Sequence, residues 1–264
     1  MSTFASLGVK KEFITSIKEL GIKTPSEIQE KAIPILLGKR TDFVGLAQTG
    51  TGKTAAFGLP IVQQVDSSKD VVQALILSPT RELVQQIKKQ LFKYTKHYEH
   101  KVFVEAVYGG EKIDIQINNL QRTTHVIVAT PGRLIDLIER GSINLKEIKT
   151  LVLDEADEML SMGFKQDLNR ILKYTSGERN TWLFSATMPE EIQRIIKTYM
   201  DSNAPRVEID RNSTVNSNIS HQFIKTSLKE KTNAIIRFLE ARDSERGIIF
   251  CRTKAGTQNL TKVL

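Results

Sequence analysis

A short glycine-rich segment contains the residues with the most specific chemical meaning. Glycines at positions 50 and 52 allow the backbone to curl so that its N–H groups point at phosphate oxygens. Lys53 would then place a positive charge on the β- and γ-phosphates, and Thr54 would offer its hydroxyl to magnesium. The strict pattern starts with glycine where this chain has Ala47, but the part that faces phosphate is complete. The predicted nucleotide-binding residues of this segment are Gln48, Thr49, Gly50, Thr51, Gly52, Lys53 and Thr54.

Two adjacent carboxylates, Asp154 and Glu155, directly follow the apolar run Thr150–Leu153. Ligands of open α/β sheets lie at the carboxyl ends of the strands, so both carboxylates should face the same phosphates. Asp154 can hold magnesium through water, and Glu155 can accept a proton from an attacking water. Since binding alone does not need both groups, the pair predicts hydrolysis. The predicted catalytic residues are Lys53, Asp154 and Glu155, and the predicted metal ligands are Thr54 and Asp154.

Alternating apolar runs and helically spaced segments must position these groups. Continuous apolar strands separated by helices are typical of a parallel sheet covered on both faces. We therefore predict a doubly wound α/β domain with at least six strands. The expected strands are Asp42–Leu46, Ala74–Leu77, Val102–Val107, His125–Val128, Thr150–Leu153 and Thr181–Phe184, and the expected helices include Arg81–Thr95, Leu134–Glu139 and Pro189–Met200.

A helical region precedes the first strand. Thr24 is expected to cap a helix with Pro25 at its first position and Glu27 completing a capping box. Pro34 should then kink or end that helix. We predict four parts of the chain: a helical region at 1–40, the main domain at 41–209, a linker at 210–220 and a second α/β domain at 221–264.

The predicted second domain is incomplete. An extended stretch at His221–Thr226, a helix at Lys229–Ala241, a strand at Gly247–Phe250 and a helix from Ala255 are expected. About forty residues cannot close a parallel α/β core, so we expect the remainder of this domain to follow Leu264.

The composition agrees with an ordinary globular protein. Of the 264 residues, 40% are hydrophobic and 26% charged, and no apolar run reaches the ~18 residues of a membrane span. A lone cysteine, Cys251, excludes an internal disulfide framework, and no signal peptide is visible, so we expect a cytoplasmic protein. The net charge of +8 weakly favours a polyanionic partner, nucleic acid first.

The sequence Asp154-Glu155-Ala156-Asp157 resembles the motif that names the DEAD-box ATP-dependent RNA helicases of superfamily 2, and the resemblance runs from Phe4 to about Thr253. It implies a RecA-like P-loop NTPase fold and ATP with Mg²⁺ as cofactors. The segment Gly21–Gln29 is similar to the adenine-reading Q motif of the family, in which Gln29 fits ATP over GTP. The resemblance adds Phe4, Ile22 and Gln29 to the nucleotide site, with Ile22 where many members have an aromatic residue.

Three further segments resemble the RNA-contacting motifs of the family, and each follows an expected strand. Contacts of this kind grip the sugar-phosphate backbone, so binding should be salt-sensitive and largely independent of base sequence. Individually, such residues are also common in ordinary turns. The predicted RNA-binding residues are Pro79, Thr80, Arg81, Gly109, Gly110, Thr130, Pro131, Gly132 and Arg133.

Ser185-Ala186-Thr187 is similar to the family motif that couples ATP hydrolysis to strand separation. The hydroxyls of Ser185 and Thr187 could hydrogen-bond Asp157 and link the ATP loop to its neighbour. The alternative is that these residues only cap the next helix.

The resemblance implies an ATP-dependent RNA helicase that unwinds short duplexes or remodels ribonucleoprotein, acting as a monomer on RNA with or without protein cofactors. We expect this chain alone to be weakly active, because phosphoryl transfer owes ~10³–10⁵ in rate to an arginine finger, expected beyond Leu264. A nucleotide-dependent RNA clamp and a DNA-directed enzyme stay open as alternatives. The target RNA is not predicted.

Overall fold

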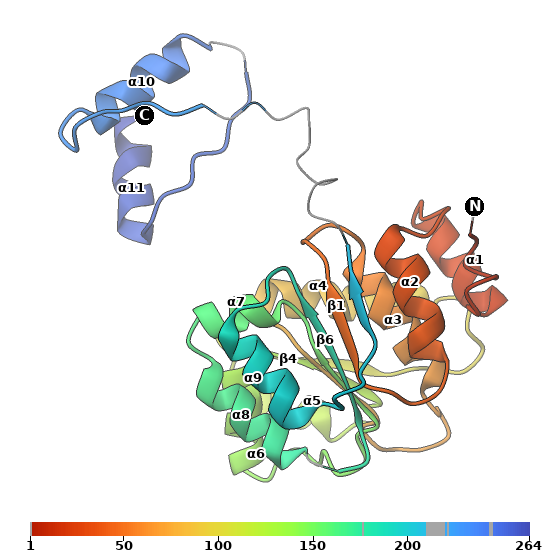
Figure 1. Cartoon of the computed structure of the whole chain (residues 1–264). Helices are drawn as coiled ribbons and strands as arrows, with labels where there is room; N and C mark the ends of the chain where they lie inside the picture. The colour runs from red at the N-terminus through yellow and green to blue at the C-terminus, as the bar shows by residue number, and fades with distance from the viewer. Residues whose placement is uncertain (1, 176, 210–219, 221, 243–244) are drawn as a thin grey trace. The chain divides into compact units, whose positions relative to one another are not determined.

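The computed structural model describes residues 2–175, 177–209, 220, 222–242 and 245–264, and the chain divides into two compact units, Met1–Thr214 and Val215–Leu264. The first unit contains a seven-stranded sheet with helices on both faces, and the second contains two helices in its described part (Figure 1). No described helix is long and apolar enough to cross a membrane.

All strand pairs of the sheet are parallel, which confirms the predicted doubly wound α/β class. The strand order is β3-β4-β2-β5-β6-β1-β7. The six predicted strands form, with ends that differ by two residues at most, and an unpredicted seventh strand, β7, pairs with β1. The strands are β1 Phe43–Leu46, β2 Ala74–Leu77, β3 Val104–Val107, β4 Val126–Ala129, β5 Thr150–Leu153, β6 Asn180–Ser185 and β7 Arg206–Glu208.

The strand order divides the predicted site residues into two groups at one edge of the sheet. The strands that precede the predicted nucleotide and coupling segments, β5, β6 and β1, are neighbours, and so are β3, β4 and β2, which precede the predicted RNA-contacting segments. The register aligns the ends of the strands: Leu46 lies opposite Ser185, and Leu77 lies opposite both Leu153 and Ala129. The carboxyl ends of the strands therefore bring all these segments to one edge.

Two hydrophobic clusters, one on each face, hold the sheet between its helices. One cluster contains buried residues of α1, α2, α3 and α4, and the other packs α6, α7, α8 and α9 together with partly buried residues of α5. These two groups of helices cover opposite faces of the sheet in Figure 1. The helices are α1 Lys11–Glu19, α2 Glu27–Leu37, α3 Lys53–Gln64, α4 Arg81–Tyr94, α5 Ile113–Leu120, α6 Pro131–Glu139, α7 Ala156–Ser161, α8 Lys165–Tyr174 and α9 Glu190–Tyr199.

The helix α2 corrects two predictions. It begins at Glu27 with Ser26 as its N-cap, so the predicted start at Thr24 and Pro25 is wrong by two residues. The side chain of Gln29, rather than that of Glu27, accepts the Ser26 N–H at 3.0 Å, as in a capping box. Pro34 does not end the helix, because Ile33 and Leu36 on either side of it are anchored in the core.

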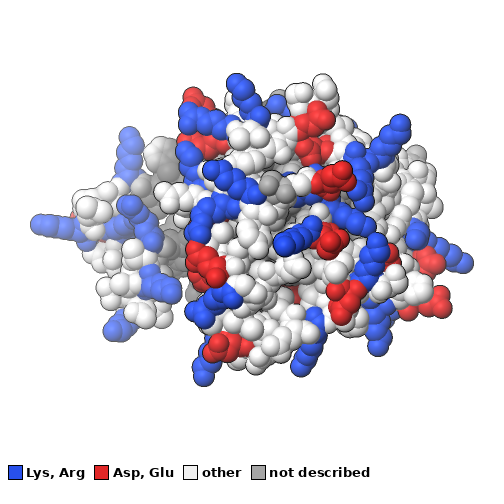
Figure 2. Space-filling view, turned by 90° about the horizontal axis from the view of Figure 1, so that it is seen from below, with Lys and Arg blue, Asp and Glu red and all other residues white. Residues whose placement is uncertain are grey.

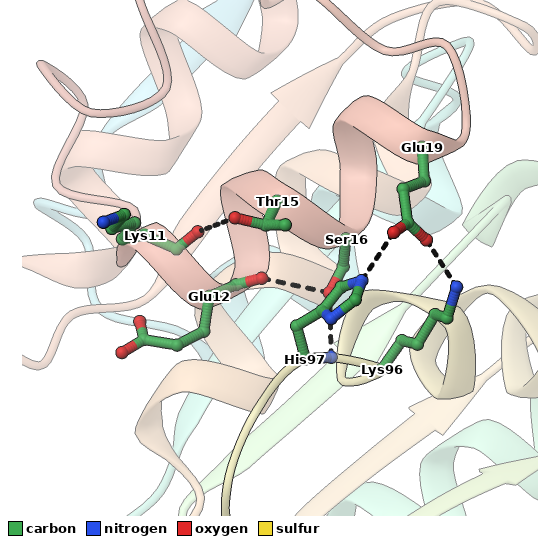
Figure 3. Close-up of polar contacts among 7 residues, drawn as sticks. All are labelled: Lys11, Glu12, Thr15, Ser16, Glu19, Lys96 and His97. Carbon is green, nitrogen blue, oxygen red and sulfur yellow. Dashed lines mark hydrogen bonds and ion pairs between the residues drawn. The ribbon is translucent and has the colours of Figure 1, made fainter.

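Helix α1 is tied to the end of α4 by a small polar network (Figure 3). The Glu19 carboxylate contacts Lys96 Nζ at 2.6 Å and His97 Nε2 at 2.7 Å. The Ser16 hydroxyl accepts the His97 N–H at 3.3 Å and donates to the Glu12 carbonyl at 3.0 Å. The pKa of Glu19 lies below its ordinary value because of the hydrogen bonds from Lys96 and His97. The network fixes the segment that leads into α2.

The second unit contains α10 (Lys231–Glu240) and α11 (Lys254–Val263) in its described part, and both predicted helices are found. The predicted strand Gly247–Phe250 does not form, and Ile248 and Phe250 are 82% and 90% exposed. A strand needs a neighbour for its backbone groups, and the described residues of this unit supply none. Residues 222–226 have no regular structure, whereas His221 and nearly all of the predicted linker lie outside the described residues.

The surface charge is mixed on the face seen from below. Figure 2 shows Lys and Arg scattered among Asp and Glu on this face, without a single large basic region. The net charge therefore does not mark an interface here, and candidate sites must be argued from individual contacts.

Candidate nucleotide and nucleic-acid sites

The glycine-rich loop between β1 and α3 depends on two left-handed residues. Gly50 has φ +84° and Gly52 has φ +96°, a region in which residues with a side chain are strained. A Cβ at Gly52 would lie only 2.3 Å from Gln29 Nε2, whereas one at Gly50 would meet no atom within 4 Å. Gly52 is therefore required both by the loop conformation and by its contact with α2.

The segment before α2 is bonded directly to this loop. Gln29 Nε2 donates to the Gly52 carbonyl at 3.0 Å, and the Ser26 hydroxyl donates to the Thr51 carbonyl at 2.7 Å. Gln29 is buried and both ends of its amide are used by backbone groups. Phe4 is buried and Ile22 half-buried in the same hydrophobic cluster as α2. The structure thus places Gln29 against the loop and Phe4 and Ile22 in the neighbouring core, and contact of any of them with adenine stays a prediction.

Two buried charged groups near the loop each have an atom without a hydrogen-bond partner among the described residues, although the Asp154 carboxylate also accepts the Glu155 backbone N–H. Lys53 is 6% exposed and Asp154 is 5% exposed, and the unpartnered atoms are Lys53 Nζ and Asp154 Oδ1. Burial raises the pKa of Asp154 to about 7; the positive charge of Lys53 opposes this rise and Glu155 adds to it. Buried polar atoms that lack hydrogen bonds are costly, so Lys53 Nζ and Asp154 Oδ1 together point to a charged ligand.

The loops after β1 and β5 meet although β6 lies between the two strands. Thr49 Oγ1 donates to Glu155 Oε1 at 3.1 Å. Glu155 has φ +52° and is the only residue other than glycine in the left-handed region within the described chain. Such a conformation costs roughly 1–3 kcal/mol and is typical of functional sites. The Glu155 carboxylate is therefore held beside the glycine-rich loop rather than turned into solvent.

The donor set fits magnesium bound together with a triphosphate. Asp154 offers a buried carboxylate oxygen without a partner, and Thr54 lies at the start of α3 with its hydroxyl. The described residues contain no cluster of three or more His, Cys, Asp or Glu that could hold a metal by themselves. This agrees with Mg²⁺ chemistry, in which one or two protein oxygens act with phosphate oxygens and water.

The end of β6 is bonded to the loop after β5. Asp157 Oδ2 accepts the Thr187 hydroxyl at 2.7 Å and the Thr187 N–H at 2.9 Å, while the Ser185 hydroxyl donates to the Thr187 carbonyl at 2.7 Å. Partial burial raises the pKa of Asp157, but hydrogen bonds, led by that from Thr187, outweigh it and bring the pKa below its ordinary value. Thr187 makes the stronger contact with Asp157, and the Ser185 hydroxyl also contributes to lowering its pKa, as the sequence predicted for both hydroxyls.

The predicted RNA-contacting segments after β2 and β3 lie side by side. Thr80 is the N-cap of α4 and its hydroxyl accepts the Leu83 N–H at 3.3 Å. Arg81 is exposed and pairs with Glu82 at 2.6 Å. A Cβ on Gly110, which has φ +92°, would lie 3.3 Å from an Arg81 guanidinium nitrogen. Arg81 and the exposed pair Gly109 and Gly110 therefore present one accessible surface, with Pro79 buried behind it.

Arg133 points into the protein. Its side chain is 12% exposed, and both terminal nitrogens donate to the Glu111 carbonyl at 3.1 Å. Thr130 and Pro131 are buried and Gly132 is half-buried, so this segment stands behind the surface rather than on it. Gln116 was not predicted from the sequence; its Nε2 donates to the Tyr108 carbonyl at 2.9 Å and to Glu111 at 2.7 Å. Arg133 and Gln116 together fix the loop that contains Gly109 and Gly110.

Comparison with known proteins agrees with this geometry. Residues 26–195 match the family model of the DEAD/DEAH box helicases. This chain belongs to the DEAD/DEAH box helicase family. It is 43% identical over its whole length to the DEAD-box ATP-dependent RNA helicase CshA of Geobacillus kaustophilus, and 43% identical to the ATP-dependent RNA helicase DeaD of Escherichia coli.

Its structure also resembles the crystal structure of a DEAD box protein from the hyperthermophile Methanococcus jannaschii, with a TM-score of 0.73, 35% identity and coverage of 99% of this chain and 69% of that one. The sheet of the first unit is therefore the RecA-like fold of a DEAD-box protein. The chain spans 56% of the CshA relative and 41% of the DeaD relative, about half the length of the curated proteins it matches.

Proposed function

We propose that this DEAD-box chain is the ATP-binding part of an RNA-stimulated ATPase that unwinds short RNA duplexes or remodels RNA–protein complexes. One observation carries the proposal most directly: the loop ending in Lys53 and the loop starting at Asp154 meet through the Thr49–Glu155 bond, and each contributes a buried charged group with an unpartnered atom. The printed names of the CshA and DeaD relatives support ATP as the nucleotide and RNA as the substrate.

In this proposal the glycine-rich loop binds the triphosphate through its N–H groups, and Lys53 neutralises the β- and γ-phosphates. Asp154 and Thr54 would hold Mg²⁺, which screens phosphate charge and favours attack at the γ-phosphate. Glu155 accepts the proton of the attacking water, and its bond to Thr49 orients the carboxylate. Gln29 ties the segment before α2 to Gly52, so a base bound near that segment would affect the loop.

RNA would lie along the accessible surface of Arg81, Gly109 and Gly110, while Arg133 supports that surface from below through Glu111. The bond between Asp157 and Thr187 joins the loop after β5, part of the nucleotide group, to the end of β6. If hydrolysis broke or rearranged this bond, the loop after β5 would move relative to the loop after β6. Thr187 is therefore proposed as a coupling residue, not as a catalytic one.

The test combines three measurements on the 264-residue chain and on a longer protein that contains it. Steady-state ATP hydrolysis should rise with RNA, and Glu155→Gln should lower turnover by roughly 10²–10⁴-fold while ATP still binds. Strand displacement beside filter binding separates a helicase from a clamp, because a clamp would bind without displacement. Stimulation of ATP hydrolysis by RNA and by DNA of the same sequence shows which nucleic acid the protein acts on. Unchanged turnover in Glu155→Gln would overturn the proposed mechanism.

We also propose that the 264-residue chain alone turns over ATP slowly compared with a full-length relative, which the same assay measures. A cytoplasmic location, action as a monomer and the participation of protein cofactors remain predictions. Fractionation of cells and sedimentation of the purified protein would test the first two.

A further inference from the structure

A hollow lies at the edge of the first unit's sheet opposite the candidate ATP site, where β1, β2, β5 and β6 begin. Its volume is about 290 Å³, and the ends of α2 and α3 complete its wall. Three cationic residues line it, Lys39, Arg40 and Lys149, and no Asp or Glu does. The residues of the candidate ATP site follow the other ends of β1 and β5, so the hollow is a separate feature.

The positive charge of the hollow is not neutralised by the protein. In the part of the chain that the structure describes, none of Lys39, Arg40 and Lys149 has a carboxylate within 4.0 Å. Asp66 is close enough for Lys149 to affect its pKa, but the Asp66 carboxylate already accepts the Ser68 hydroxyl at 2.6 Å and lies 3.7 Å from Lys69. The lining therefore carries three unpaired cations around one cavity.

Polar groups of the hollow also lack partners. Thr150 is only 6% exposed, and neither its hydroxyl nor the side-chain amide of Asn180 makes a hydrogen bond to any described residue. By contrast, Gln73 lines the same hollow, but both polar atoms of its amide form hydrogen bonds with the backbone of Asp66. The Thr150 hydroxyl is therefore free to donate to a ligand in the hollow, and the three unpaired cations beside it favour an anionic one.

The simplest alternative to a ligand site is that the cations interact with a helix dipole, and this accounts for only some of the polar residues that line the hollow. Lys39 and Arg40 follow the C-terminus of α2, where positive charge is favourable because of the helix dipole. That argument does not reach Lys149 or Thr150, which stand at the start of β5. The apolar floor of the hollow is the outer edge of the hydrophobic core, because Leu36, Ile61, Val65 and Trp182 line it and all four belong to the core cluster.

We propose that this hollow binds a phosphate-bearing ligand of nucleoside monophosphate size. Arg40 and Lys149 would hold the phosphate, with Lys39 at the rim, and Thr150 would donate its hydroxyl. The base would cover the apolar floor. The volume lies at the lower end of small-molecule sites, which begin at about 300 Å³, so a larger ligand would extend into solvent. This site does not depend on the proposed helicase activity.

Calorimetric titration of the 264-residue chain with guanosine 5′-monophosphate tests the proposal, because the predicted ATP site selects adenine. Arg40→Gln and Lys149→Gln should each weaken binding about tenfold. Thr150→Val should weaken it several-fold without lowering the melting temperature, since its hydroxyl bonds to nothing in the described protein. Lys173→Gln removes the same charge from the exposed end of α8 and should leave the affinity unchanged.

Two controls separate this site from the candidate ATP site and from simple charge attraction. Lys53→Ala should abolish ATP binding and leave binding of guanosine 5′-monophosphate intact. Guanosine, which lacks the phosphate, should not bind. The proposal is overturned if the parent shows no saturable binding, if Lys53→Ala removes it, if Lys173→Gln weakens it as much as Arg40→Gln, or if guanosine binds equally well. Failure of ATP turnover alone would contradict the proposed helicase function and leave this site standing.

Discussion

The buried carboxylate of Asp154 should make the stability of the folded chain depend on pH when nucleotide and metal are absent. Its pKa in the folded chain is about 7, against an ordinary value of 3.8, because burial disfavours the ionised form. The folded state therefore binds the proton more tightly than the unfolded state. This contribution to stability is complete below pH 3.8 and is lost as the pH rises through 7.

The expected magnitude follows from the two pKa values. Between pH 5 and pH 8 the ionisation of Asp154 should remove roughly 3 kcal/mol of stability, at 1.36 kcal/mol per pKa unit. For a unit of this size that corresponds to roughly 5–10 °C in melting temperature. Asp154→Asn mimics the protonated form, so its melting temperature should exceed that of the parent by this amount at pH 8 and approach it at pH 5.

Thermal unfolding from pH 5 to pH 8 in the presence of a chelator measures this effect. Glu155→Gln is the matched control, because it removes the neighbouring, half-buried carboxylate and should leave most of the parent's pH dependence in place. Adding Mg²⁺ and ATP should stabilise the parent more at pH 8 than at pH 5, whereas Asp154→Asn should not show this difference between the two pH values. If the parent and Asp154→Asn melt in parallel over the whole range, the raised pKa of Asp154 is refuted.

Three further outcomes are expected. Gly52→Ala should lower ATP affinity by more than tenfold, because its Cβ would meet Gln29, while Gly50→Ala adds only strain from its positive φ and should cost less in a nucleotide titration. Thr187→Val should leave ATP binding unchanged but reduce strand displacement several-fold; equal losses in both assays would contradict a coupling role. Arg133→Lys should weaken RNA binding several-fold in a filter assay without affecting ATP binding, because a lysine cannot replace the two-nitrogen contact with Glu111.

The sequence predicted the strands that have an apolar run and missed the one that has none. Ala74–Leu77 and Thr150–Leu153 are continuous apolar runs, and the structure has both with the predicted bounds. In β7 only Val207 is buried, so its three residues carry no apolar pattern, and the strand exists because β1 offers a free edge. The expected strand Gly247–Phe250 fails for the opposite reason: it has the apolar pattern and no described partner.

The candidate site was predictable as a set of residue types and not as a set of contacts. Lys53, Asp154 and Glu155 follow from local motifs, since a glycine turn and a strand end set their positions. The contact of Gln29 with Gly52 depends on how α2 packs beside α3, which no local pattern reports. Arg133 shows the same limit: its type and motif predict a phosphate contact, whereas packing of α6 places it under the loop after β3.

The strand order gives a physical reason why nucleotide and RNA could influence each other within this one sheet. The two groups of segments meet at the neighbouring strands β2 and β5, whose ends are aligned at Leu77 and Leu153. Asp154 follows Leu153 directly, and its N–H donates to the Leu77 carbonyl at 2.9 Å, three residues before Thr80. Protonation or metal binding at Asp154 therefore acts one strand away from the proposed RNA surface, through a rigid backbone hydrogen bond rather than through a flexible side chain. If this path matters, Asp154→Asn should change RNA affinity as well as ATP turnover, whereas Glu155→Gln, which leaves the Asp154 carboxylate in place, should change turnover alone.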